Sequence, residues 1–117
     1  MINLNSAIKP QLVLMPGMSD IHQDHKVIAL EGLRAFKKTS ILTYELPWNN
    51  VLCDTGRFFV KLDEENIINK LRALGCYKSQ RKKIYFKEDF IRSLAVVRGT
   101  QIGVQYAEAF NVARWIL

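Results

Sequence analysis

The sequence predicts an α/β fold in which a parallel sheet is flanked by helices, and we expect residues 1–117 to form a single, partial domain of this class. A short apolar run at residues 12–15 is followed by a polar loop and then by a stretch with helical periodicity. A second apolar run begins near residue 40. Strand, loop, helix and strand in this order pair the two strands in parallel through a right-handed crossover.

The remaining elements follow from periodicity and from turn residues. Residues 3–8 suggest a short helix or a connector that Pro10 ends. Asp20 or Asp24 is expected to cap the first long helix, and Asp63 the second. The expected helices are residues 26–37, 63–74 and 87–98. The expected strands are residues 11–15, 40–46, 58–60 and 108–116. Because the chain opens on a connection instead of a strand, we expect the sheet to be incomplete at its N-terminal side.

The composition is that of an ordinary globular protein, with 49% hydrophobic and 24% charged residues. The sequence has no apolar run of the roughly 18 residues that a membrane span needs. Its first residues lack the basic and apolar regions of a signal peptide, so we expect a cytoplasmic protein without a membrane span. Cys53 and Cys76 have no CxxC spacing and are expected to be reduced and structural.

The net charge is +6, and much of the excess is concentrated between two expected helices. The basic residues there are Lys78, Arg81, Lys82 and Lys83, with Lys87 just beyond. Such a charge attracts nucleic acid, anionic lipid or an anionic substrate. No nucleic-acid-binding motif accompanies it, so a solvated basic loop is the favoured interpretation and nucleic acid is not an expected partner.

Both histidines of the chain, His22 and His25, lie in a polar cluster between the first strand and the first long helix. Ligands of open α/β sheets bind at such strand ends. The helix N-terminus favours a neutral imidazole at His25, which is the form that binds a metal. His22 is placed to donate a proton or to stabilise an oxyanion. Asp24 or Asp20 can orient a histidine by accepting its ring N–H.

Two histidines do not complete the three protein ligands of a catalytic zinc site. Cys53 and Asp54 are candidates for the rest, although a structural thiol is the favoured interpretation of Cys53. A solvated helix cap is the alternative interpretation of the whole polar cluster. The residues by themselves therefore indicate half of a metal site.

Five segments, in this order, carry a family resemblance. They are Asp20-x-His22-x-Asp24-His25, Tyr44-Glu45-x-Pro47-Trp48-x-Asn50, Cys76-Tyr77-Lys78-Ser79-Gln80, Arg98-Gly99 and Tyr106-Ala107-Glu108-Ala109-Phe110. Together they resemble the C-terminal part of the PIG-L/LmbE family of zinc-dependent deacetylases, from about residue 10 to residue 116. The resemblance implies a Rossmann-like fold and a hydrolase that removes the N-acetyl group of an N-acetylglucosamine-type sugar.

The resemblance also implies roles for three residues. By position, His25 matches a zinc ligand, His22 matches the histidine with the general-acid or oxyanion role, and Asp24 matches the acid that tunes it. The family takes its other two ligands and its general base from an N-terminal His-Pro-Asp-Asp type motif, which this sequence lacks. We therefore expect a segment of a longer or split enzyme that binds zinc weakly and is inactive alone.

The expected partners are an amino-sugar substrate in the complete enzyme, and either an N-terminal complementing segment or a second copy of the chain. The alternative is a non-catalytic remnant or interaction module that associates through an exposed sheet edge.

Overall fold

The computed structural model describes residues 1–50, 58–80 and 82–117. The chain divides into two compact units. Unit 1 comprises Met1–Phe58 and Ala109–Leu117, and unit 2 comprises Phe59–Glu108. Within the described ranges, no helix has both the length and the apolar character needed to cross a membrane.

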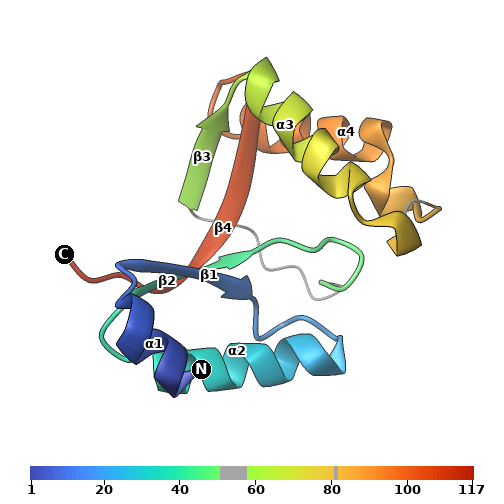
Figure 1. Ribbon diagram of the computed structural model, residues 1–117. Coiled ribbons are helices and arrows are strands. Elements are labelled where there is room, and N and C mark those ends of the chain that lie inside the picture. The colour runs from blue at the N-terminus through green and yellow to red at the C-terminus, as the bar shows by residue number, and fades with distance from the viewer. Residues whose placement is uncertain (51–57, 81) are drawn as a thin grey trace. The chain divides into compact units, whose positions relative to one another are not determined.

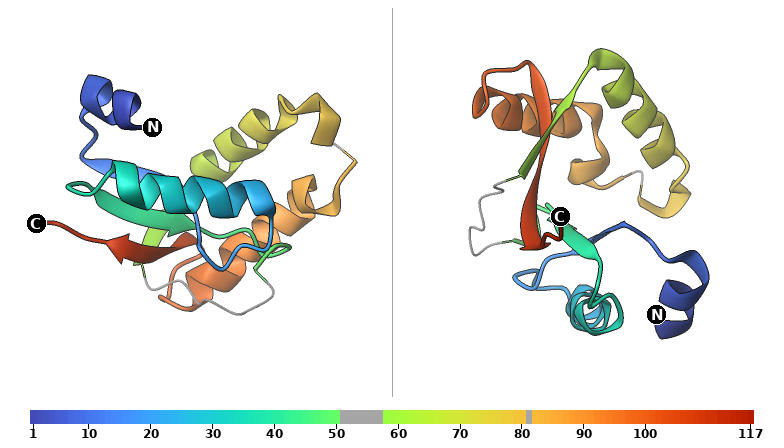
Figure 2. Two further views of the ribbon diagram at one scale, coloured as in Figure 1. Left: turned by 90° about the horizontal axis from the view of Figure 1, so that it is seen from below. Right: turned by 90° about the vertical axis from the view of Figure 1, so that its left-hand side faces the viewer.

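Unit 1 contains the expected strand–helix–strand arrangement, which is confirmed. It is formed by β1 (Leu12–Pro16), α2 (Gln23–Ala35) and β2 (Ser40–Tyr44). The two strands are parallel, with Leu12 opposite Ser40 and Pro16 opposite Tyr44. α2 runs below β1 and β2 in Figure 1, and Figure 2 shows it covering one face of this pair. Before β1, the chain forms a short helix, α1 (Ile2–Ile8), which ends at Lys9 in a left-handed conformation.

The core of unit 1 lies between α2 and the two parallel strands. Met15, Phe36 and Ile41 are buried there, with partly buried residues packed around them. Gly32 allows α2 to approach the sheet, because a Cβ at this position would lie 2.6 Å from the Met15 sulfur. This close approach explains a glycine inside a helix, where it costs roughly 1 kcal/mol relative to alanine.

The third strand of this sheet is β4 (Tyr106–Arg114), which pairs with β2 in the antiparallel direction. Tyr44 lies opposite Phe110, and Leu42 lies opposite Val112. The strand order is β1-β2-β4-β3, so β1 is an edge strand. The α/β class is confirmed. The sheet is mixed, however, because side-chain alternation predicts that a segment is a strand but does not predict its direction.

Unit 2 is built from β3 (Phe58–Leu62), α3 (Glu64–Gly75) and α4 (Glu88–Thr100) together with the start of β4. Asp63 caps α3 as expected: it accepts a hydrogen bond from the Asn66 N–H at 2.8 Å, and the Asn66 side chain accepts one from the Asp63 N–H at 3.0 Å. α3 and α4 pack against each other. Arg92 of α4 forms ion pairs with Glu64 and Glu88.

Two short 3₁₀ turns lie between α3 and α4: η1 (Lys78–Gln80) is in the expected basic loop, and η2 (Ile84–Phe86) follows it. At the other end of α4, Gly99 lies against the chain that leads into β4. A Cβ on Gly99 would be 2.5 Å from the Val104 carbonyl oxygen, so this position has no room for a side chain.

Candidate metal-binding and catalytic site

The polar cluster lies in unit 1, in the turn between β1 and α2. Its centre is Asp20, which is 1% exposed. The Asp20 N–H donates to the carbonyl oxygen of Gly17 at 3.3 Å, which closes the turn after β1 and directs this residue inwards. A carboxylate buried to this degree needs hydrogen-bond donors around it, and the turn supplies them.

The two oxygens of Asp20 accept hydrogen bonds from two different residues. Oδ1 accepts from the backbone N–H of His22 at 2.8 Å. Oδ2 lies 2.7 Å from Nδ1 of His25, a residue on the first turn of α2. Asp20 therefore fixes both the entry of the chain into the helix and the orientation of the His25 ring.

The cap of α2 is His22, which corrects the expectation that Asp20 or Asp24 would cap this helix. The His22 Nδ1 accepts a hydrogen bond from the Asp24 N–H at 3.3 Å. The helix begins at Gln23, three residues before the expected start, so Asp24 lies inside the first turn and Asp20 lies too far upstream. A capping side chain must come from the extended residue directly before the helix, and that residue is His22.

In their neutral forms, the two imidazoles would be opposite tautomers in these contacts. A carboxylate only accepts, so His25 carries its hydrogen on Nδ1 and leaves Nε2 free for a metal. The His22 Nδ1 accepts, so its hydrogen is on Nε2. The rings are stacked with centroids 4.5 Å apart, and the His25 side chain is 27% exposed.

The segment after β2 borders the same cluster. The carbonyl oxygen of Asn49 accepts a hydrogen bond from the Ile21 N–H at 3.2 Å, and Asn49 Nδ2 lies 3.5 Å from Asp20 Oδ2. Burial, and secondly the negative charge of Asp20, raise the pKa of Tyr44 above its ordinary value. Tyr44 and Asn49 had no assigned role from sequence. The available signal was their position, with Tyr44 as the last residue of β2 and Asn49 after it, because parallel strands end at the same sheet edge.

The structure brings His22, Asp24 and His25 together at the start of α2. Asp24 is exposed and contacts His22 through its backbone N–H, whereas the acid that holds a histidine ring is Asp20. The role of the Asp24 carboxylate stays a prediction.

The donor chemistry of this cluster fits one zinc ligand, His25 Nε2. Across residues 1–50, 58–80 and 82–117, the structure has no group of three His, Cys, Asp or Glu side chains arranged to hold a metal. The other proposed donors, Cys53 and Asp54, lie outside the described residues. A catalytic zinc would therefore need further ligands besides His25.

The sequence matches no family model and no curated protein. Among solved structures, the chain is similar to the conserved protein TT1542 from Thermus thermophilus, with a TM-score of 0.73 and 21% sequence identity. The similarity covers 99% of this chain and 57% of that chain. This chain therefore shares its fold with a little more than half of the TT1542 structure.

Proposed function

We propose that this chain is a segment of a cytoplasmic zinc-dependent hydrolase that removes the N-acetyl group from an N-acetylglucosamine-type sugar. The observation that carries the proposal is the 2.7 Å contact between Asp20 Oδ2 and His25 Nδ1. A buried carboxylate that holds one ring nitrogen and leaves the other free is the usual support of a metal-binding histidine. The resemblance of residues 20–25 to the PIG-L/LmbE motif is the reason for proposing zinc-dependent removal of an N-acetyl group.

In this proposal, His25 contributes one zinc ligand through Nε2, and Asp20 keeps the ring in the tautomer and orientation that ligation requires. The remaining ligands and the general base come from a segment with a His-Pro-Asp-Asp type motif. Zinc, when bound, polarises the amide carbonyl and lowers the pKa of water.

His22 supplies a proton or a hydrogen bond in this scheme. Its Nδ1 is occupied by the Asp24 N–H, so the hydrogen on Nε2 is available to the developing oxyanion or to the leaving amine. The His22 and His25 rings are stacked. In this proposal His25 binds the metal and His22 supplies the proton. Asp24 retains its proposed role as the acid that tunes His22.

The test is complementation. The chain is mixed with a polypeptide that carries the missing motif, association is verified by size-exclusion chromatography, and amine release from an N-acetylglucosamine derivative is measured with zinc. We expect activity from the associated pair and none from the chain alone. His25→Ala should abolish the activity, whereas Glu31→Gln, an exposed acid on α2, should not change it. No activity from a demonstrably associated, zinc-loaded pair would refute the proposal.

Zinc binding by the chain alone is a separate test of the incomplete site. Because the described residues include no group of three potential metal ligands, we expect weak binding in calorimetric titration. Tight one-to-one binding by the isolated chain would contradict this expectation.

The alternative function is an interaction module, and the specific observation behind it is the edge position of β1. Leu12 and Leu14 of this strand are 44% and 54% exposed. An edge with exposed apolar side chains is a template for pairing with another strand. Light scattering of the wild type and of Leu14→Lys tests this: association that the lysine abolishes supports the module, and a wild type that stays monomeric at high concentration argues against it.

A further inference from the structure

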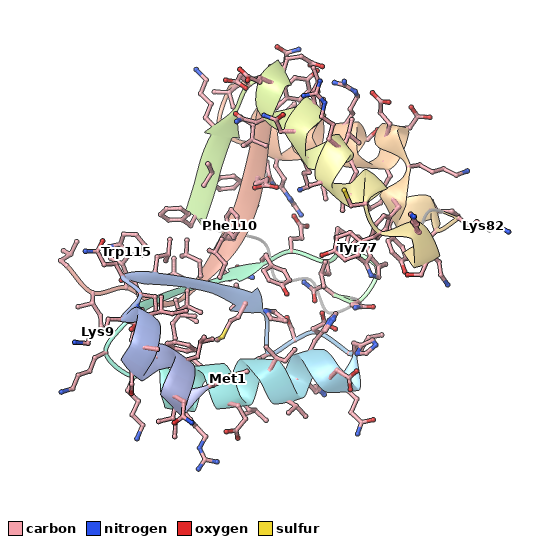
Figure 3. All side chains as sticks on the ribbon, viewed as in Figure 1. Met1, Lys9, Tyr77, Lys82, Phe110 and Trp115 are labelled. Carbon is pink, nitrogen blue, oxygen red and sulfur yellow. The ribbon has the colours of Figure 1, made fainter. Side chains whose placement is uncertain are left out.

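Residues 77–80 and 82–87, which connect α3 to α4, form what we call the basic–aromatic segment of unit 2. It includes four exposed lysines and no acidic residue. The lysines are Lys78, Lys82, Lys83 and Lys87. Figure 3 shows the Lys82 side chain extending away from the helices of this unit.

The charge of these lysines is not neutralised by the described part of the chain. None of the four forms an ion pair with another described residue, while elsewhere in unit 2 Lys70 pairs with Glu108. The nearest acid in sequence, Glu88, is already paired with Arg92. The segment therefore presents a local positive potential that an anionic partner can neutralise.

The same segment also exposes apolar surface. Ile84 is 72% exposed and Tyr77 is 60% exposed, and Ile84 is the most exposed large apolar residue among the described residues of unit 2. The turn that carries Ile84 is anchored, because η2 packs against α4. The Phe86 ring meets those of Tyr77 and Tyr85 edge-on, with centroids 6.2 Å and 5.5 Å apart.

We propose that the basic–aromatic segment docks this protein onto a lipid bilayer that carries anionic headgroups. The lysines would neutralise headgroup charge, as juxtamembrane polybasic segments do. Ile84 and Tyr77 would enter the interfacial layer, where an apolar side chain and an amphipathic ring gain from partial burial. This inference does not depend on the proposed deacetylase function, since it rests on residues of unit 2 alone.

A nucleic acid is the competing partner for such a charge, and the structure favours it less. Single-stranded nucleic acids bind to aromatic side chains that present their faces to the bases. Here the Tyr77, Tyr85 and Phe86 rings form an edge-on cluster among themselves. Base stacking and phosphate binding give an exposed aliphatic side chain such as Ile84 no apolar surroundings, whereas the interfacial layer of a bilayer does.

The test is co-sedimentation of the full chain with phosphatidylcholine vesicles that either contain or lack phosphatidylglycerol. We expect binding to the anionic vesicles at low salt, weak binding to the neutral ones, and release at about 0.5 M salt, where screening is strong. No binding to anionic vesicles at low salt would overturn the proposal. A single-stranded oligonucleotide that binds while the vesicles do not would overturn it in favour of nucleic acid.

Matched variants locate the surface. Lys82→Gln combined with Lys83→Gln should weaken vesicle binding roughly tenfold or more, given the contribution of each lysine near an anionic surface. Lys37→Gln combined with Lys38→Gln removes the same charge from two adjacent exposed lysines of unit 1 and should have a much smaller effect. Equal losses from the two pairs would overturn the assignment to this segment.

The apolar contribution has its own control. Ile84→Ser should weaken vesicle binding several-fold, whereas Val97→Ser, at a 51% exposed position on α4, should not. Circular dichroism checks that every variant is folded. Identical binding by the two serine variants would contradict insertion of Ile84.

Discussion

The substitution Asp20→Asn should invert the tautomer of His25. In the wild type, the two carboxylate oxygens serve two donors, the backbone N–H of His22 and the Nδ1–H of His25. Asparagine has one oxygen and one amide group at the same positions, so one of the two donors would face another donor. The backbone N–H cannot change its role, whereas an imidazole can move its hydrogen to the other nitrogen. We therefore expect His25 to become an acceptor at Nδ1 and to carry its hydrogen on Nε2.

The magnitude follows from the burial of Asp20. A hydrogen bond to a charged group contributes about 1.5–3 kcal/mol, which favours the Nδ1–H tautomer of neutral His25 by roughly ten- to hundredfold in the wild type. Replacing this charge-assisted bond by a neutral one, at a residue that is 1% exposed, should lower the free energy of unfolding by about 1–2 kcal/mol. Moving the hydrogen to Nε2 would also block the nitrogen that we propose binds zinc, and loss of such a support typically lowers metal affinity 10–100-fold.

The assay is long-range ¹H–¹⁵N correlation spectroscopy of the imidazoles at alkaline pH, which separates the two tautomers. The chain has two histidines, so His22→Gln assigns both signals. We expect a hydrogen on Nδ1 of His25 and on Nε2 of His22, and a change at His25 alone in Asp20→Asn. The control is Asp24→Asn, which keeps the backbone N–H that contacts His22. A wild-type His25 with its hydrogen on Nε2, or a His25 signal unaffected by Asp20→Asn, would refute the reasoning.

Three further predictions concern stability. Gly99→Ala should lower the free energy of unfolding by about 2 kcal/mol or more in denaturant titration, because the added Cβ would lie 2.5 Å from a backbone atom. Gly75→Ala is the control: its Cβ would meet no atom within 4 Å, so it should be neutral or slightly stabilising. Asp63→Ala removes half of a reciprocal cap and should cost about 1 kcal/mol in the same measurement, whereas Asp63→Asn should cost less. The raised pKa of Tyr44 favours the neutral phenol in the folded state, so the contribution of Tyr44 to stability is present below about pH 10 and is lost as the pH rises through the folded-state pKa. Tyr44→Phe should therefore lose less stability at alkaline pH than the wild type. Equal losses in the two proteins would count against burial as the cause of the raised pKa.

Periodicity and turn residues predicted the elements of the chain well, because each element depends on local rules. Short apolar runs predicted β1 and β2, and Asp63 predicted the start of α3. The direction of β4 was not predictable in this way, since alternation is the same in parallel and antiparallel strands. The predicted start of α2 was three residues too late. His22, which is not among the preferred N-cap residues, caps this helix with its ring nitrogen.

The residues of the candidate site could be predicted from the sequence, but the contacts between them could be predicted only in part. His22 and His25 were singled out from sequence, and the structure stacks their rings. Asp20 and Asp24 were both candidates to orient a histidine, and spacing alone did not separate them. The structure does, because Asp20 is buried with Oδ2 towards His25, while Asp24 lies exposed within the first turn of α2.

The contacts of Asp20 are local in sequence, so they can form without the other parts of the proposed site. Its partners His22 and His25 are two and five residues away, on the turn and the first helical turn that follow β1. Contacts this close in sequence form with the strand–helix connection itself and need neither a metal nor a second polypeptide. The Asn49 contact, 29 residues away, adds the segment after β2 to the same arrangement. In the proposed enzyme, this arrangement would preorganise one ligand position before a complementing segment binds, and that segment would need to supply only its own ligands and the contact area for association.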